Sequence, residues 1–175
     1  MFFRDESHIK EINRLKKQVA DLQLAMHKLT QELHFEAGLK KSHILRLKNG
    51  DNISDDYIIN KRSYVDLTPE AAYKIYNNLD QDFVLLDVSA NSYEPIKEFP
   101  EALKIPLDDL AQNLHRLPGK SKHYMIISEN GVKSIKACKF LNLHGYFYLS
   151  NISGGYSYWP EFKNLKEFVS RGDAA

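Results

Sequence analysis

The chain has 175 residues, of which 43% are hydrophobic and 27% charged, and its formal net charge is +1. This composition fits one medium-sized folded domain with an appendage and excludes a disordered or fibrous protein. A charge so close to neutral provides no basic field for wholesale binding, so we expect neither nucleic acid nor membrane as a partner.

A single cysteine excludes an intramolecular disulfide. The opening residues become charged at once, without an apolar stretch of signal-peptide or membrane-spanning length. We therefore expect a cytoplasmic protein. The seven histidines are scattered, with no pair at metal-binding spacing, so we predict no metal site and no cofactor.

Apolar side chains near the N-terminus recur at alternating spacings of three and four, which is the a/d pattern of a heptad repeat. This seam consists of Ile12, Leu15, Val19, Leu22, Met26, Leu29 and Leu33. Isoleucine and valine at a with leucine at d, and Glu11 placed to reach Lys16 of a partner helix, favour a parallel dimer. The remaining e and g positions are uncharged and also tolerate trimers or tetramers.

The alternative is a single amphipathic helix that folds back on the domain, with the apolar stripe as part of the core. The stripe is narrow and flanked by polar residues, which favours the coiled coil. Gly38 can adopt a left-handed cap and end the helix. We therefore assign residues 1–38 to a coiled-coil helix that makes the protein a homo-oligomer.

Residues 39–63 are predicted to connect this helix to the domain. The Asn-Gly dipeptide at 49–50 lies between apolar alternations, which indicates a β-hairpin. The second strand of such a hairpin would begin late, so a longer loop is the alternative.

Short apolar strands alternate with helical runs from residue 64 onward. Thr68-Pro69-Glu70 begins a helix with a threonine cap and a proline in the first turn. Residues 83–86 and 123–127 are predicted to be buried strands, and a helix is expected from Pro106. This alternation predicts a parallel sheet with helices on both faces.

The strand at 123–127 leads into a loop made of Ser128, Glu129, Asn130, Gly131, Val132 and Lys133, and Ser134 follows at the start of a helix. Successive backbone N–H groups at such a turn, together with the helix N-terminus, form a cradle for anions. The predicted anion- or ligand-binding residues are Ser128, Asn130, Gly131, Val132, Lys133, Ser134 and Ser89.

With its surroundings, this loop resembles that of rhodanese-like (sulfurtransferase) domains, where a cysteine comes first, a glycine fourth and Arg-Ser usually last. Other family signatures follow in order, namely Leu85-Leu86-Asp87-Val88, Glu98-Phe99-Pro100-Glu101-Ala102, Ile105-Pro106-Leu107, Gly145-Tyr146, Gly154-Gly155 and Trp159. The resemblance covers residues 64–168 and implies a rhodanese-like α/β domain, which we assign to residues 64–175.

The departures from the family pattern concern its chemistry. Ser128 stands at the cysteine position, and a hydroxyl cannot attack sulfane sulfur and carry it as a persulfide. Ser89 and Lys133 stand where the family commonly has arginine, and Glu129 adds a negative charge beside the cradle. Cys138 falls on the apolar face of the following helix, so we expect it to be structural.

The resemblance therefore implies a non-catalytic binding, scaffolding or regulatory protein with an unidentified protein partner. The alternative is an enzyme, sulfurtransferase-related or of another kind, that uses the same pocket with Ser128 in place of cysteine. A hydrolase-like pair of Ser128 with His123 or His144 is a more distant version of this alternative.

Overall fold

A computed structural model describes residues 3–96 and 99–161 of the chain. Glu98 and the part of the resemblance that lies beyond residue 161 are therefore outside the described residues. The chain forms two compact units that divide between Ala37 and Gly38. The described part of the first unit is entirely helical.

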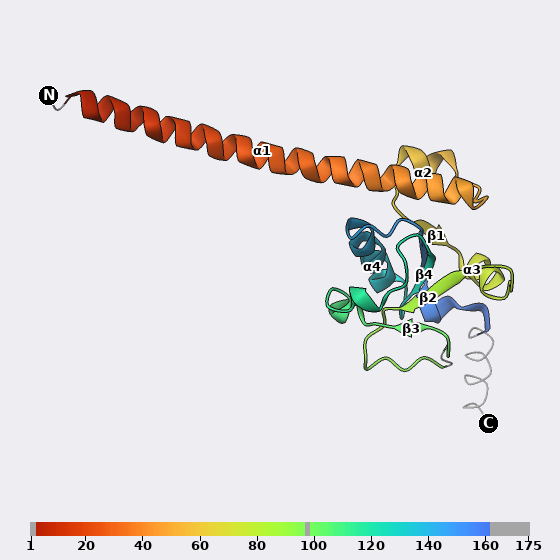
Figure 1. The fold of residues 1–175 in the computed structure, drawn as a ribbon. Coiled ribbons are helices and arrows are strands. Elements are labelled where there is room, and N and C mark those ends of the chain that lie inside the picture. Colours follow the sequence, from red (N-terminus) through yellow and green to blue (C-terminus); the bar gives the residue numbers. More distant parts are fainter. Residues whose placement is uncertain (1–2, 97–98, 162–175) are drawn as a thin grey trace. The chain divides into compact units, whose positions relative to one another are not determined.

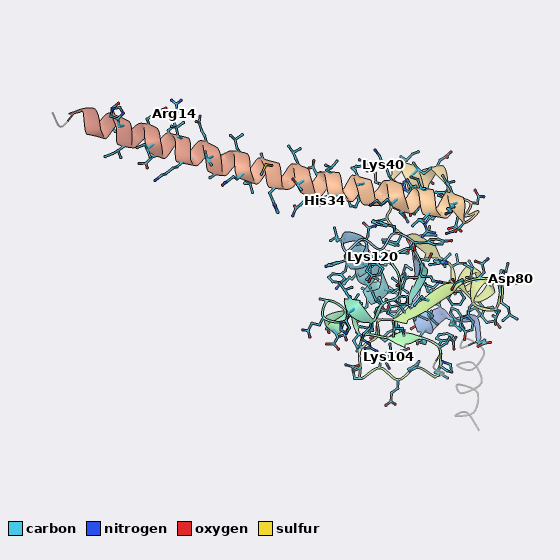
Figure 2. All side chains as sticks on the ribbon, in the orientation of Figure 1. Arg14, His34, Lys40, Asp80, Lys104 and Lys120 are labelled. Atoms are coloured by element: carbon cyan, nitrogen blue, oxygen red, sulfur yellow. The ribbon has the colours of Figure 1, made fainter. Side chains whose placement is uncertain are left out.

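The first element is one long helix, α1 (Phe3–Lys48) (Figure 1). Side chains such as Arg14 and His34 project from the part of α1 that forms the first unit (Figure 2). The seven seam side chains are all substantially exposed, with exposed fractions from 49% to 68%. The single chain thus leaves the apolar stripe in water.

The prediction that Gly38 ends this helix was wrong, because Gly38 lies inside α1. It is buried, and a β-carbon there would approach Cε1 of Phe147 to 3.1 Å. Close packing of the helix against an aromatic ring accounts for the glycine, so a left-handed cap is not its role.

The predicted β-hairpin was also wrong, because the Asn-Gly dipeptide ends α1 instead. Gly50 has φ +80°, and the N–H of Asp51 donates to the carbonyl of Arg46 at 3.0 Å, as in a Schellman motif. A type I′ hairpin turn and this cap both need a glycine at positive φ, so the dipeptide alone does not distinguish them. A short helix, α2 (Asp55–Ile59), follows where a strand was expected.

The described part of the second unit holds five parallel strands in the order β1-β5-β4-β2-β3. They are β1 (Val65–Leu67), β2 (Phe83–Asp87), β3 (Leu103–Lys104), β4 (His123–Ile127) and β5 (Leu149–Ile152). Helices α3 (Pro69–Tyr76) and α4 (Val132–Leu143) lie on opposite sides of the sheet (Figure 1). The predicted α/β fold is confirmed.

Smaller differences concern the helical segments. Thr68 caps α3 as predicted, with its hydroxyl accepting from the N–H of Ala71 at 3.2 Å. The helix expected from Pro106 is a single 3-10 turn, Leu107–Asp109. Two further 3-10 turns span Leu114–Arg116 and Gly155–Tyr158.

Strand β4 is buried along its whole length and alternates between two core clusters. Tyr124 and Ile126 pack in the cluster that includes Ala137, Cys138 and Leu141 of α4. Their neighbours Met125 and Ile127 pack in the cluster that includes Ala72 of α3 and Trp159. Leu143, the last residue of α4, is exposed. Because both faces of the strand are covered, its sequence is apolar without alternation.

The end of α1 and helix α2 form what we call the foot, residues 38–59. Its buried centre is Arg46, which is 2% exposed. The guanidinium pairs with Asp51 at 2.9 Å and donates to the carbonyl of Leu149, the first residue of β5. The foot is therefore attached at the amino end of the sheet.

Aromatic rings complete this attachment. The Arg46 guanidinium carbon lies 5.6 Å from the ring centroid of Tyr57 and 4.9 Å from that of Tyr148. A planar, weakly hydrated guanidinium stacks well on such faces. Beside it, His123 stacks on Tyr148 at 4.2 Å, and its Nε2 lies 2.9 Å from the hydroxyl of Ser150. Burial and then the Arg46 charge lower the pKa of His123 to about 4.

We expect the free energy of unfolding to fall as the pH drops from about 6.5 to about 4. The unfolded chain binds a proton at His123 near its ordinary pKa of 6.5, whereas the folded chain does so only near 4. Acid therefore favours the unfolded state by up to about 3 kcal/mol.

Urea unfolding at several pH values measures this dependence. His123→Gln removes this group and should reduce the dependence within that window. His43, whose pKa burial also lowers, should account for part of the remainder. His115→Gln replaces an exposed histidine of the same unit and should leave the dependence unchanged. An equal pH dependence in wild type and His123→Gln would show that another group is responsible.

Candidate functional site

Two loops follow the carboxyl ends of the neighbouring strands β2 and β4, the edge at which parallel α/β sheets bind ligands. The register pairs Asp87 with Ile127 at these ends. Ser89 follows β2 and Ser128 follows β4, and both are fully buried. The topology thus brings Ser89 and Ser128, two of the three predicted site serines, to one edge of the sheet.

The Ser128 hydroxyl lies inside a closed hydrogen-bond network. Its oxygen accepts from the backbone N–H of Gly131 at 3.1 Å and from that of Ser134 at 3.2 Å. The Ser134 hydroxyl donates to the Gly131 carbonyl at 2.9 Å. Since a hydroxyl has one proton, the 3.2 Å contact between the two serine oxygens must be a donation from Ser128 to Ser134.

Both lone pairs and the proton of Ser128 are therefore in use. A nucleophilic serine needs a base that takes its proton. The two histidines named above as possible bases for Ser128 lie away from its hydroxyl. His123 begins β4, roughly 16 Å along the strand from Ser128, and bonds to Ser150. His144 follows α4 and has its Nδ1 2.8 Å from the Phe140 carbonyl. No hydrolase-like pair is formed.

The rest of the loop is organised as the start of α4. Gly131 is the N-cap residue with φ +88°, and the side-chain oxygen of Asn130 accepts from the Val132 N–H at 3.1 Å. The side chain of Val132 is 54% exposed. The predicted anion-binding residues are thus together, but the N–H groups of Gly131, Val132 and Ser134 already have acceptors. Anion binding here stays a prediction.

Glu129 places a carboxylate across the mouth of this loop. Its Oε1 accepts from the Ala90 N–H at 2.9 Å and from the Lys133 ammonium at 2.6 Å. Burial raises the pKa of Glu129, but these two donors lower it by more, so it lies below its ordinary value. Lys133, predicted to assist an anion, is thereby neutralised by a residue of the same loop.

Asp87 is a buried acid at this edge that the sequence analysis did not single out. Its Oδ1 accepts from the Ser89 N–H at 2.9 Å, and its Oδ2 accepts from the Tyr156 hydroxyl at 3.0 Å. The Ser89 hydroxyl is buried and has no hydrogen-bond partner among the described residues. An acid that ends an apolar strand was the available signal for Asp87.

The segment 154–157 holds the loop from the other side. The Tyr156 N–H donates to the Ser128 carbonyl at 3.0 Å. The N–H and hydroxyl of Ser157 both donate to the Glu129 carbonyl, at 3.1 and 2.9 Å. A β-carbon on Gly155 would lie 1.8 Å from the Ser128 carbonyl oxygen. The glycine pair of the family signature thus allows two backbones to touch.

Cys138 does not reach this site as a free nucleophile. It lies in the core between the sheet and α4 and is fully buried. Burial raises the pKa of its thiol well above the ordinary value, so the reactive thiolate is disfavoured.

Within residues 3–96 and 99–161, no group of three or more histidine, cysteine or acidic side chains is arranged to hold a metal ion. None of the helices in the described part of the chain is both long and apolar enough to cross a membrane.

We expect Gly155→Ala to destabilise the second unit by about 3 kcal/mol or more. The added methyl must displace the Ser128 carbonyl, and alanine is strained at the observed φ of +53°. Urea unfolding gives the change. Gly119→Ala is the matched control, since no atom lies within 4 Å of its β-carbon position. A loss below about 1 kcal/mol in Gly155→Ala would mean that the loop does not rest on this contact.

No protein-family model matches the chain. A solved structure from Bacillus anthracis, reduced CoADR-RHD, is 22% identical with a TM-score of 0.50, over 59% of this chain and 18% of that one. The rhodanese-like domain protein of Staphylococcus aureus is 24% identical with a TM-score of 0.49, over 54% of this chain and 90% of that one. At these identities, structural likeness concerns the fold alone.

A Bacillus subtilis protein, "Putative sulfurtransferase YtwF", is 30% identical over 89 residues. The match spans 51% of this chain and 84% of that protein. On this similarity, the chain belongs to the rhodanese-like (sulfurtransferase) family.

Proposed function

We propose that this protein is a non-catalytic member of its family, which binds or scaffolds a partner protein and self-associates through its N-terminal helix. One observation carries the first part: the Ser128 hydroxyl, at the position of the family cysteine, is buried with all its hydrogen-bonding capacity used. A cytosolic location is part of the proposal.

Sulfur transfer requires a soft nucleophile that can hold sulfane sulfur as a persulfide. Ser128 lacks the sulfur, and Cys138 is buried in the core with a raised pKa. In this proposal the backbone N–H groups that would cradle a persulfide donate instead to the side-chain oxygens of Ser128 and Asn130. Ser128 is then a structural residue.

Electrostatics support the same proposal. An anionic donor such as thiosulfate would need positive charge at the mouth of the loop. Lys133 is the cation of this loop, and its 2.6 Å contact with Glu129 cancels its charge locally. Ser89 supplies no charge from the neighbouring strand.

The second candidate is an enzyme that uses this pocket with Ser128. It is favoured by the name of the Bacillus subtilis relative, "Putative sulfurtransferase YtwF", which suggests sulfur chemistry in that protein. The hydrogen-bond network of Ser128 and the ion pair at the loop mouth count against it. Direct assay separates the two candidates.

We expect no thiosulfate sulfurtransferase activity in the purified protein. Thiocyanate formed from thiosulfate and cyanide should not exceed that of a heat-denatured sample, because no accessible thiolate is available. Ser128→Cys should restore little, since Glu129 still neutralises Lys133. Ser128→Cys with Glu129→Gln should be more active than Ser128→Cys alone.

Activity of the wild-type chain above the denatured control would overturn the non-catalytic proposal. Cys138→Ser then serves as the control for a hidden nucleophile. Loss of activity in Cys138→Ser would assign the activity to Cys138, and loss in Ser128→Ala would assign it to Ser128.

Self-association is proposed from the seam of α1. Its seven apolar side chains are 49% to 68% exposed in the single chain. Such a row loses its contact with water when two helices interlock at positions a and d. A long solvent-exposed helix gains most of its stability from such burial. A parallel dimer is the state that these side chains favour.

We expect the full chain to be a dimer and Leu22→Asp/Leu29→Asp to be a monomer in light scattering. Two carboxylates at d positions would be buried without partners in the dimer. Leu24→Asp is the matched control, because Leu24 is similarly exposed, at 56%, but lies off the seam. A monomeric wild-type chain, or a double variant that still dimerises, would contradict the coiled coil.

A further inference from the structure

The foot carries four large apolar side chains that the second unit leaves exposed. Their exposed fractions are 63% for Ile44, 65% for Leu47, 47% for Ile58 and 73% for Ile59. We call these four residues the foot surface. A contiguous patch of exposed large apolar groups is a mark of interaction sites.

Within the foot, one face of α1 is buried and another is exposed. Leu39, Ser42 and Arg46 are buried, and their spacings of three and four place them on one face of the helix. Ile44 and Leu47 are three residues apart and share another, exposed face. The attachment of the foot to the sheet therefore leaves the foot surface uncovered.

Helix α2 is held against this end of α1 (Figure 1). The hydroxyl oxygens of Ser42 and Tyr57 are 3.3 Å apart, and the ring of Tyr57 lies 5.2 Å from that of His43. Buried Tyr57 thus fixes α2, while the next two residues, Ile58 and Ile59, remain exposed. The exposed apolar groups of both helices belong to one packed element.

The heptad numbering of the seam can be continued along α1 into the foot. Counted in sevens along the sequence from Ile12, Leu47 falls on position a and Ile44 on position e. Lys40 is the intervening a residue, exposed on this stretch of α1 (Figure 2). Together with Glu36 and His43 at d positions, Lys40 interrupts the seam, and Leu47 is the next apolar residue at a seam position.

We propose that the foot surface is a second self-association surface, occupied by the foot surface of a second copy of this chain. The proposal rests on the coiled-coil dimer proposed above and adds its orientation. In a parallel, in-register pair, residues of the same number lie at the same height, so the two Leu47 side chains meet. In an antiparallel pair, Leu47 of one chain would lie near the opposite end of the partner helix.

Self-recognition fits the charges around this surface. Exposed Lys41 and Lys48 lie on α1, whereas exposed Asp55 and Asp56 begin α2. A two-fold interface must be self-complementary, and a patch with both signs at its rim satisfies this requirement. A seam of three and a half heptads is barely long enough to form a coiled coil by itself. Pairing through this seam would raise the effective concentration of one foot near the foot of the second copy.

Disulfide trapping in the full chain tests the proposal. Leu47→Cys should give a covalent dimer under mild oxidation, because a disulfide requires the two Cα atoms to be within about 7 Å. Leu22→Cys reports on the seam. Leu79→Cys is the negative control, since Leu79 is fully exposed on the same unit and lies outside the foot. Buried Cys138 should not react in any of them.

The outcomes separate the two proposals. Cross-linking of both Leu47→Cys and Leu22→Cys, well above Leu79→Cys, supports the foot surface. Cross-linking of Leu22→Cys with Leu47→Cys at the level of the control leaves the coiled coil standing and overturns the foot surface. A monomeric chain that cross-links at neither position overturns both.

A second measurement avoids oxidation. Leu47→Asp should raise the dissociation constant of the dimer by about tenfold or more, since it replaces a side chain buried in the pair by a charge. Leu79→Asp should leave it unchanged. Equal dissociation constants for wild type and Leu47→Asp would also overturn the proposal.

Discussion

Burial of strand β4 on both faces is the constraint from which the arrangement of the second unit follows. Parallel neighbours on either side of β4 require crossover connections, and these place α3 and α4 on opposite faces of the sheet. All connections then leave at the carboxyl edge and return at the amino edge. The loop at Ser128 and the foot around Arg46 consequently lie at opposite edges of the sheet.

In the proposed function, the loop keeps the backbone geometry of a site whose chemistry has changed. The turn and the N-terminus of the helix present backbone N–H groups regardless of which residue occupies the first position of the loop. At this position the hydroxyl of Ser128 accepts hydrogen bonds from them, as a thiolate would. The hydroxyl differs because it also donates, to Ser134, and because oxygen cannot carry sulfane sulfur. The carboxylate of Glu129 pairs with the ammonium of Lys133 at the entrance of the loop. Function therefore has to be argued from this site, since the fold permits both outcomes.

The long helix gives the protein a second kind of surface. Near Arg46 its buried face is attached to the sheet through the Leu149 carbonyl and the ring of Tyr148. Asp51 and the ring of Tyr57 hold the same guanidinium within the foot. Its apolar seam and the foot surface face water in the single chain. These surfaces are proposed to be satisfied by a second copy, which would present two domains from one coiled coil and let a partner bind with avidity.

The sequence by itself determined the features that depend on local periodicity. Buried strands, the capped helix at Thr68 and the loop after β4 all follow from patterns that span a few residues, and the predicted α/β fold is confirmed. Only the tertiary structure decided what single residues do. Gly38 leaves room for the ring of Phe147, and Gly50 ends a helix. The hydroxyl of Ser128 uses its hydrogen-bonding capacity within its own loop and the start of α4. Glycine, serine and charged side chains fit several local structures, so their roles depend on partners that the folded chain brings near.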